Sequence, residues 1–230
     1  MAEFAVILPA AGRSTRFGSA VSKLFQHLGD RPVLAWTLAA FAGRDDVRQI
    51  VIAATDEQAV EECTKYLGKS QRQKLKICPG GTCRAGSVRE ALVRTSEEIE
   101  WVAVHDAARP LVSAALIDRT FALAQQHGAA AAALPVHLTI KQAVGPLPAP
   151  VQRTVPREQL WAMQTPQIAR RKDLLAAFAS CPLPLSEITD DVQLLELAGK
   201  TVWLAMGEES NLKITTPLDL QIAEMFLRPK

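Results

Sequence analysis

"EFAVILPA", residues 3–10, is apolar from Phe4 onward and shows no alternation with polar residues. A short run of this kind is typical of a strand that is buried on both faces of a parallel sheet. Similar runs predict further strands, and stretches with helical spacing that begin or end at Pro or Gly predict helices between them. The expected strands lie at 48–54, 74–81 and 100–106, and the expected helices at 32–43, 56–68, 84–95 and 113–128. This alternation predicts an α/β fold with a Rossmann-like, mainly parallel sheet and helices on both faces.

Two segments fit the alternation less directly. Residues 129–136, AAAAALPV, would suit a helix by composition, but their place in the order favours a strand. The following stretch, 137–161, is rich in proline, and two extended limbs around GPLPAP would make it a projecting β-hairpin arm. Because an isolated hairpin is only marginally stable, we expect the arm, at about 137–158, to pack against a second copy in a homodimer. A mobile surface loop is the alternative.

The composition limits the possible functions. Hydrophobic residues make up 48% of the 230 residues and charged residues 22%, as in an ordinary globular enzyme, and we expect a single domain over 1–230. A net charge of +2 argues against a broad nucleic-acid surface, and the longest apolar stretch, 128–136, is too short to span a membrane. The N-terminus lacks the features of a signal peptide. The four cysteines form no CxxC pair, so we expect reduced thiols in a cytoplasmic protein.

The segment after the first strand, LPAAGRSTRFGSAVSK (8–23), carries three positive charges among small residues. It is neither the GxxxxGK[ST] phosphate loop nor the GxGxxG dinucleotide motif. A tight turn at 10–12 can present successive backbone N–H groups to phosphate oxygens, and Arg16 and Lys23 add positive charge. This arrangement suits a triphosphate that is attacked at its α-phosphorus, where negative charge develops. A solvated basic loop is the alternative.

Three other polar segments follow predicted strands, so we expect them at the same rim of the sheet. They are GGTCRAGS (80–87), HDAARP (105–110) and SNLKITTP (210–217). Asp106 can accept sugar hydroxyls or bind Mg²⁺, with a helix N-cap or an ion pair to Arg109 as the alternative. Its neighbour His105 is expected to be structural, since a phosphate nucleophile is already ionised and needs no base. In ITDDVQ (188–193), Thr189 is expected to cap a helix and to be free to contact substrate as well.

The blocks PAAGRSTRF…SK, HDAARP, LWAMQTPQ, TDD and NLKITTP occur in this order along nearly the whole chain. Together they resemble the 2-C-methyl-D-erythritol 4-phosphate cytidylyltransferases of the non-mevalonate isoprenoid pathway. The resemblance implies a nucleotidyltransferase that converts CTP and methylerythritol phosphate into CDP-methylerythritol and pyrophosphate. It also implies Mg²⁺ or another divalent cation, held mainly by the CTP phosphates with Asp106 as a further ligand, and a homodimer joined by its arms.

The resemblance implies a role for each matching residue. Catalytic roles fall to Arg16, Lys23 and Lys213; nucleotide contacts to Ala10, Ala11, Gly12, Gly81, Thr82, Arg84, Ser87 and Ala107; and substrate contacts to Asp106, Arg109, Thr139, Arg157, Thr165 and Thr189. Thr139 and Arg157 would reach across the dimer from the arm, where an arginine fork suits a phosphate.

The sequence departs from the family pattern at three places. Ser14 or Thr15 replaces the second glycine of the first loop, which makes that turn less permissive. Thr82 replaces an acid in the base-recognition turn, and Leu138 replaces an acid in the arm. The charged residues with implied roles are all present, so we expect an active enzyme.

Three other readings remain open from the sequence. A ribitol 5-phosphate cytidylyltransferase would share the fold and mechanism, although PAAG, HDAARP and PREQLW favour methylerythritol phosphate. A nicotinamide-dependent oxidoreductase would need GxGxxG and an acid about twenty residues later, whereas only Gly12 is present where the motif needs three glycines, and Asp30 lies in a polar turn. A non-catalytic nucleotide-binding protein is the third, and the retention of both Arg16 and Lys23 argues against it.

Overall fold

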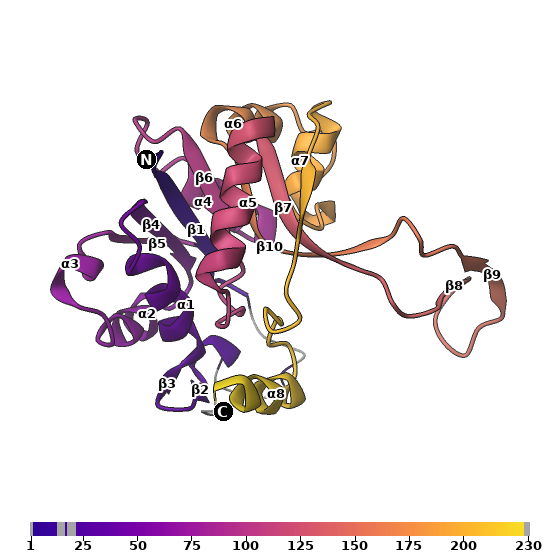
Figure 1. Ribbon diagram of the computed structural model, residues 1–230, viewed down its shortest axis with the longest axis horizontal. Coiled ribbons are helices and arrows are strands. Elements are labelled where there is room, and N and C mark those ends of the chain that lie inside the picture. Colours follow the sequence, from indigo (N-terminus) through magenta and orange to yellow (C-terminus); the bar gives the residue numbers. More distant parts are fainter. Residues whose placement is uncertain (1, 13–16, 18–21, 228–230) are drawn as a thin grey trace.

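The computed structural model describes residues 2–12, 17 and 22–227. Its centre is a seven-stranded sheet in the order β11–β7–β10–β6–β1–β4–β5 (Figure 1). The strands are β1 Phe4–Pro9, β4 Val47–Ala54, β5 Leu75–Pro79, β6 Trp101–Val104, β7 Ala129–Pro135, β10 Trp161–Arg170 and β11 Trp203–Met206. All pairings are parallel except those of β10, which runs antiparallel to β6 and β7. The predicted α/β fold and its mainly parallel sheet are confirmed.

Helices cover both faces of the sheet. On one face lie α1 Val33–Ala42, α2 Glu57–Thr64 and α5 Ala114–His127, and on the other α4 Arg84–Leu92, α6 Arg171–Ala179 and α7 Asp191–Leu197. The shorter elements are η2 Lys23–Phe25, β2 His27–Leu28, β3 Arg31–Pro32, α3 Lys69–Arg72 and η3 Leu185–Glu187, and α8 Pro217–Leu227 follows the last strand. Within the described residues, no helix is long and apolar enough to cross a bilayer.

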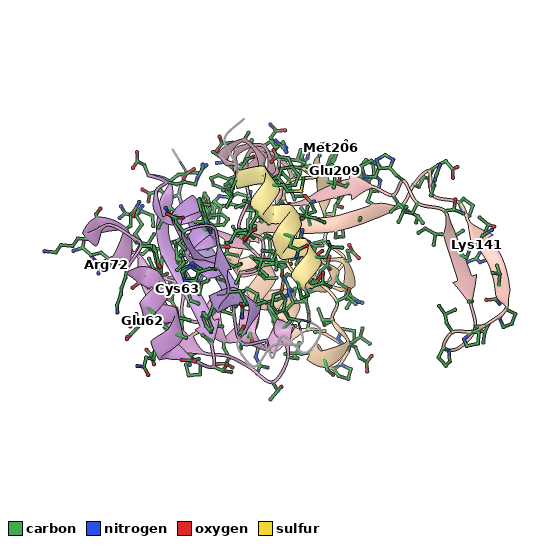
Figure 2. The ribbon with its side chains drawn as sticks, turned by 90° about the horizontal axis from the view of Figure 1, so that it is seen from below. Glu62, Cys63, Arg72, Lys141, Met206 and Glu209 are labelled. Atoms are coloured by element: carbon green, nitrogen blue, oxygen red, sulfur yellow. The ribbon has the colours of Figure 1, made fainter. Side chains whose placement is uncertain are left out.

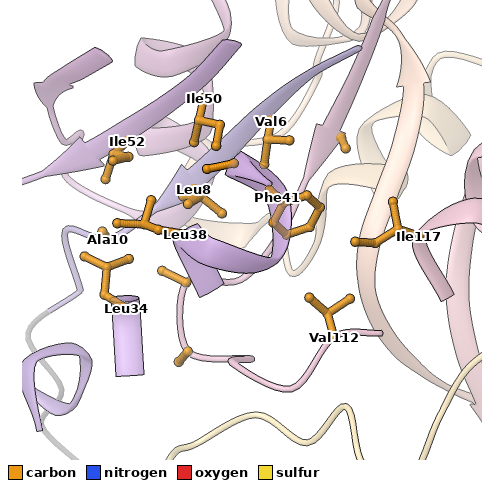
Figure 3. Close-up of a cluster of buried hydrophobic side chains, with 14 of the residues drawn as sticks. Val6, Leu8, Ala10, Leu34, Leu38, Phe41, Ile50, Ile52, Val112 and Ile117 are labelled. Atoms are coloured by element: carbon orange, nitrogen blue, oxygen red, sulfur yellow. The ribbon is translucent and has the colours of Figure 1, made fainter. Parts of the chain in front are cut away.

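The first strand is buried on both faces, as its apolar run predicts. Phe4, Val6 and Leu8 point to the α1–α2–α5 side, while Ala5 and Ile7 point to the α4–α6–α7 side. Figure 3 shows Val6 and Leu8 close to Leu38 and Phe41 of α1, in the same buried cluster. Burying a large aliphatic side chain contributes about 1.5–3 kcal/mol, so alternate residues of this one strand join both halves of the core.

The order of the strands places the ends of β1 and β6 side by side. The chain passes from β1 to β4 and β5 on one side, then returns to β6 on the other side of β1. Open α/β sheets bind ligands at such a reversal, beyond the carboxyl ends of the strands. The segments that follow Pro9 and Val104 therefore form the two walls of a crevice.

The proline-rich insertion forms the predicted hairpin. Strands β8 Ile140–Ala143 and β9 Val151–Val155 pair antiparallel and form an arm that extends away from the sheet (Figure 1). Lys141 lies far out on this arm in Figure 2. Several large apolar side chains of the arm are exposed, with Leu138 at 77% and Leu147 at 83%.

His105 directly follows β6 and is buried in the core. Its backbone N–H donates to Ile7 O at 2.9 Å, and its fully buried ring packs edge-on against Phe41. The ring Nε2 lies 3.1 Å from Arg109 O, which can only accept, so Nε2 carries the proton and Nδ1 accepts from the Thr165 hydroxyl at 3.1 Å. Burial lowers the pKa of His105 from 6.5 to about 4. The structural role expected for His105 is consistent with this geometry.

The buried neutral imidazole makes stability fall with acid. Between the unfolded pKa of 6.5 and the folded pKa of about 4, the unfolded chain binds a proton that the folded chain refuses, so stability is lost as pH falls through this window. From pH 7 to pH 5 this amounts to about 2 kcal/mol of unfolding free energy. Urea unfolding at both pH values measures this change. Between pH 7 and pH 5, His105→Asn should lose less unfolding free energy than the wild type, whatever the variant's stability at pH 7. An equal loss in both proteins would contradict the prediction.

Candidate active site

A cavity of about 640 Å³ opens at the carboxyl ends of β1 and β6. Its walls come from the segments that follow β1, β5, β6 and β11. Ten residues predicted to form the site line it: Ala11, Gly12, Lys23, Gly81, Thr82, Arg84, Ser87, Asp106, Ala107 and Lys213. Ala10 lies behind the wall, because its backbone N–H donates to Ala53 O at 2.7 Å within the sheet. Arg16, Ser14 and Thr15 lie outside the described residues.

The turn between β5 and α4 packs tightly against the loop after β1. A Cβ on Gly80 would come within 2.1 Å of Ala11 Cβ, and one on Gly81 within 2.5 Å of the Gly86 carbonyl carbon, so both positions need glycine. The Gly81 N–H donates to Ser87 Oγ at 3.1 Å, and Ser87 Oγ donates to Cys83 O at 3.0 Å. The turn is therefore a fixed, narrow wall of the cavity, with Thr82 exposed at its edge.

Asp106 binds three cationic side chains at the end of β6. Its Oδ1 accepts from Arg84 Nε at 3.2 Å, and its Oδ2 lies 3.3 Å from Arg109 Nε and 2.9 Å from Lys213 Nζ. Burial alone would raise the pKa of this carboxyl, but Arg84, Lys213 and Arg109 outweigh it and hold the pKa well below its usual range. Asp106 is therefore ionised throughout the physiological pH range.

This arrangement bears on the expected metal ion. Both oxygens of Asp106 already face cations, so the carboxylate is an anchor for Arg84, Arg109 and Lys213. In the part of the chain that the structure describes, no group of three or more His, Cys, Asp or Glu side chains could hold a metal. The three cations around Asp106 disfavour a Mg²⁺ ion held mainly by that carboxylate, and Asp106 as a further metal ligand stays a prediction.

Arg109 and Thr165 support Asp106 from behind the cavity wall. Arg109 is 8% exposed and also donates through Nη1 to Asn211 O at 2.7 Å. Burial lowers the pKa of Arg109, and Asp106 opposes that shift. Thr165 is 3% exposed, and its hydroxyl accepts from the Asp106 N–H at 3.0 Å while donating to His105. Neither Arg109 nor Thr165 lines the cavity, although both were predicted to contact substrate.

The TDD motif lies differently from the prediction. Asp190, and not Thr189, is the N-cap of α7, because Asp190 Oδ1 accepts from Gln193 N at 3.1 Å. Thr189 is exposed, and its N–H and hydroxyl both donate to Gln193 Oε1. The carboxylate of Asp191 is 2% exposed, and its Oδ2 lies 2.8 Å from Arg84 Nη2. This ion pair was not predicted from the sequence, because Asp191 and Arg84 are far apart along the chain.

Thr139 directly precedes β8 and Arg157 lies two residues after β9, and neither residue lines the cavity. Both are exposed, and Arg157 donates through Nη1 to His137 O. Their predicted entry into the cavity of a second subunit stays a prediction.

Comparisons with known proteins agree on one family. The family model of 2-C-methyl-D-erythritol 4-phosphate cytidylyltransferase matches residues 4–229. A relative of that name from Gloeobacter violaceus is 44% identical over 225 residues, which cover 97% of this chain and 95% of the relative.

Solved structures extend the agreement to the fold. The crystal structure of 2-C-methyl-D-erythritol 4-phosphate cytidylyltransferase from Thermus thermophilus is 35% identical with a TM-score of 0.77, covering 97% of this chain and 98% of that one. The crystal structure of 4-diphosphocytidyl-2C-methyl-D-erythritol synthase from Anaerococcus prevotii is 26% identical with a TM-score of 0.81, covering 99% of each chain. With a family match over nearly its whole length, this chain belongs to the 2-C-methyl-D-erythritol 4-phosphate cytidylyltransferases.

Proposed function

We propose that this chain transfers CMP from CTP to 2-C-methyl-D-erythritol 4-phosphate and releases pyrophosphate. One observation carries the proposal: the loop after β1, the turn between β5 and α4 (80–83, called here the base turn), and Arg84, Asp106 and Lys213 of the cationic cluster line a single cavity. The first two features suit a nucleoside triphosphate, and the third suits a phosphorylated polyol.

The nucleotide occupies the side of the cavity formed by Ala11, Gly12 and the base turn. Backbone amides of the loop after β1 would bind the phosphates, with Lys23 beside them. The close packing of Gly80 and Gly81 leaves a narrow wall that suits a pyrimidine better than a purine. The exposed position of Thr82 is compatible with base contacts through its backbone, so the loss of the family's acid there is tolerated.

The polyol phosphate occupies the side formed by Asp106 and Lys213. The three cations of the cluster outnumber its two carboxylates, Asp106 and Asp191, which leaves positive charge for a phosphate. The Lys213 side chain is 34% exposed and lines the cavity, with its ammonium 2.9 Å from Asp106 Oδ2. Oxygen atoms of Asp106 can also accept hydroxyl groups once the substrate displaces a cationic partner.

The reaction is a displacement at phosphorus. An oxygen of the substrate phosphate attacks the α-phosphorus of CTP, a new P–O–P bond forms, and the bond from the α-phosphorus to its bridging oxygen breaks to release pyrophosphate. The nucleophile is already an anion, so no general base is required. The obstacle is bringing two anions together, and Lys23, Lys213 and Arg16 would lower it by neutralising the charge that builds at the α-phosphorus.

We infer that a divalent cation, Mg²⁺ in the simplest case, enters with the nucleotide. The cationic partners of Asp106 disfavour a second cation beside that carboxylate, so the main ligands of Mg²⁺ would be triphosphate oxygens and water, since Mg²⁺ prefers hard oxygen ligands.

We further propose a homodimer joined by the arms. The exposed apolar side chains of the β8–β9 hairpin suit burial against a second copy. Arg157 and Thr139 would then complete the partner's cavity. A cytoplasmic location fits the four cysteines, none of which is in a disulfide.

A substrate matrix tests the function directly. Pyrophosphate release is measured with Mg²⁺ for CTP, UTP, ATP and GTP against methylerythritol phosphate and ribitol 5-phosphate. We expect turnover only with CTP and methylerythritol phosphate. A preference for ribitol 5-phosphate would reassign the substrate while keeping the mechanism, and no release in any combination would refute the proposed activity.

Lys23→Ala should reduce kcat far more than it raises the KM for CTP. The ammonium matters most when charge builds at the α-phosphorus, so we expect a loss in kcat of about 100-fold or more. Steady-state kinetics with Lys172→Ala as a control, which removes one exposed lysine from α6, provides the comparison. Equal changes in kcat and KM would make Lys23 a binding residue only.

Arg157→Ala should weaken methylerythritol phosphate binding in a way that reveals a shared site. Mixing Arg157→Ala chains with Lys23→Ala chains and allowing subunit exchange would produce hybrid dimers. If the arm serves the partner's cavity, each hybrid has one site with both residues intact, and activity partly returns. Activity that stays at the level of the separate variants would show that each chain uses its own arm.

A further inference from the structure

The guanidinium of Arg84 is shared between two carboxylates. The Nε and Nη2 groups form one edge of an arginine, and this edge usually binds both oxygens of a single carboxylate. Here Nε donates to Asp106 Oδ1 at 3.2 Å, while Nη2 lies 2.8 Å from Asp191 Oδ2. Arg84 therefore connects the end of β6 to the start of α7.

This bridge joins the parts of the chain that frame the cavity. Arg84 is the first residue of α4, directly after the base turn, and Asp191 is the first residue of α7, two positions after Thr189. Gln167 on β10 fixes Asp191 from the opposite side, because its Oε1 accepts from the backbone N–H of Asp191 at 2.9 Å and of Val192 at 3.2 Å. Asp191 is thus held in place independently of Arg84.

Stability alone does not explain the buried carboxylate of Asp191. Among the described residues, Asp191 Oδ1 has no hydrogen-bond partner, Asp191 Oδ2 has only its contact with Arg84 Nη2 at 2.8 Å, and Arg84 Nη1 is also buried without a partner. Burial raises the pKa of Asp191, and Arg84 opposes that shift. Buried ion pairs of this kind are often no more stable than an apolar replacement, and buried unsatisfied groups concentrate at functional sites.

We propose that Asp191 is a positioning residue, which holds the guanidinium of Arg84 so that Arg84 fixes Asp106 in the orientation that receives the polyol phosphate. Without Asp191, the Arg84 edge would be free to turn and bind both oxygens of Asp106. That turn would move Asp106 relative to Lys213 and disturb the acceptor side of the cavity. The inference rests on the proposed function for the identity of the acceptor substrate.

Asp191→Ala tests the proposal kinetically. We expect kcat/KM for methylerythritol phosphate to fall about 10- to 100-fold, as for a catalytic group misplaced by about an ångström, with the KM for CTP changed less than about threefold. Glu196→Ala is the matched control, because it removes an exposed acid from the same helix. Arg84→Lys retains the charge but cannot bridge two carboxylates, so it should show the same selective loss even if Asp191→Ala folds poorly.

The double variant separates positioning from a general structural effect. If Asp191 acts through Arg84, adding Asp191→Ala to Arg84→Lys should cost little further activity. Losses that multiply in the double variant, or a wild-type response in Arg84→Lys, would overturn the proposal.

A spectroscopic measurement keeps the test independent of turnover. In ¹⁵N NMR of the full chain, the Arg84 Nε–H signal, assigned by its absence in Arg84→Lys, should resist solvent exchange in the wild type and in Glu196→Ala and change in Asp191→Ala. An unchanged signal would overturn the role of Asp191 even if the enzyme were inactive. An inactive wild type with the expected signal change would instead refute the proposed function.

Discussion

The site depends on one buried carboxylate that is kept ionised. Asp106 stands at the end of a strand that has no exposed residue, and only the three cations around it make that charge tolerable. Each cation comes from a different part of the chain: Arg84 from α4, Arg109 from the loop after β6, and Lys213 from the segment before α8. The same ion pairs that neutralise Asp106 therefore draw three walls of the cavity together.

The sheet makes this convergence possible. Because β1 is flanked by β4 and β6, the loops after β1, β5 and β6 open at the same rim. Close packing then restricts the conformation of the turn between β5 and α4. A methyl group on Gly80 would collide with Ala11, and one on Gly81 would collide with the start of α4. Close backbone packing shapes the side of the cavity proposed for the nucleotide, and ion pairs shape the side proposed for the acceptor.

The sequence predicted the parts of the fold that follow from local pattern. Local pattern predicted the parallel strands β1, β4, β5 and β6, and alanine-rich β7 was assigned from its place in the order, whereas the parallel edge strand β11 was not predicted. The antiparallel β10 was not predicted, because its buried residues include Gln164, Thr165 and Gln167, which leave no apolar signal. Their side chains bind Asn211, Asp106 and Asp190, partners that only the folded chain brings near.

The site shows the same division between local and tertiary information. The position of Asp106 at a strand end could be predicted from the sequence. Of its three cationic partners, only Arg109, three residues later, could be predicted as well. In TDD, two adjacent acids look alike in sequence and differ completely in environment. Asp190 faces the helix end and caps it, whereas Asp191 is turned inward to Arg84. Successive residues at the start of a helix point in different directions, so one of two adjacent acids is buried and the other is not.

The charge state of the site suits a nucleophile that is already ionised. His105 lies beside Asp106, yet its ring is neutral at pH 7, because burial lowers its pKa to about 4. A neutral imidazole committed to Arg109 O and Thr165 can neither accept the proton of a substrate nor add charge to the cavity. The arginines of the cluster are likewise fixed cations, so the charge that an incoming phosphate meets stays constant across the pH range in which the fold is stable. Such a cavity works by electrostatic preorganisation, with no proton transfer to or from its own side chains.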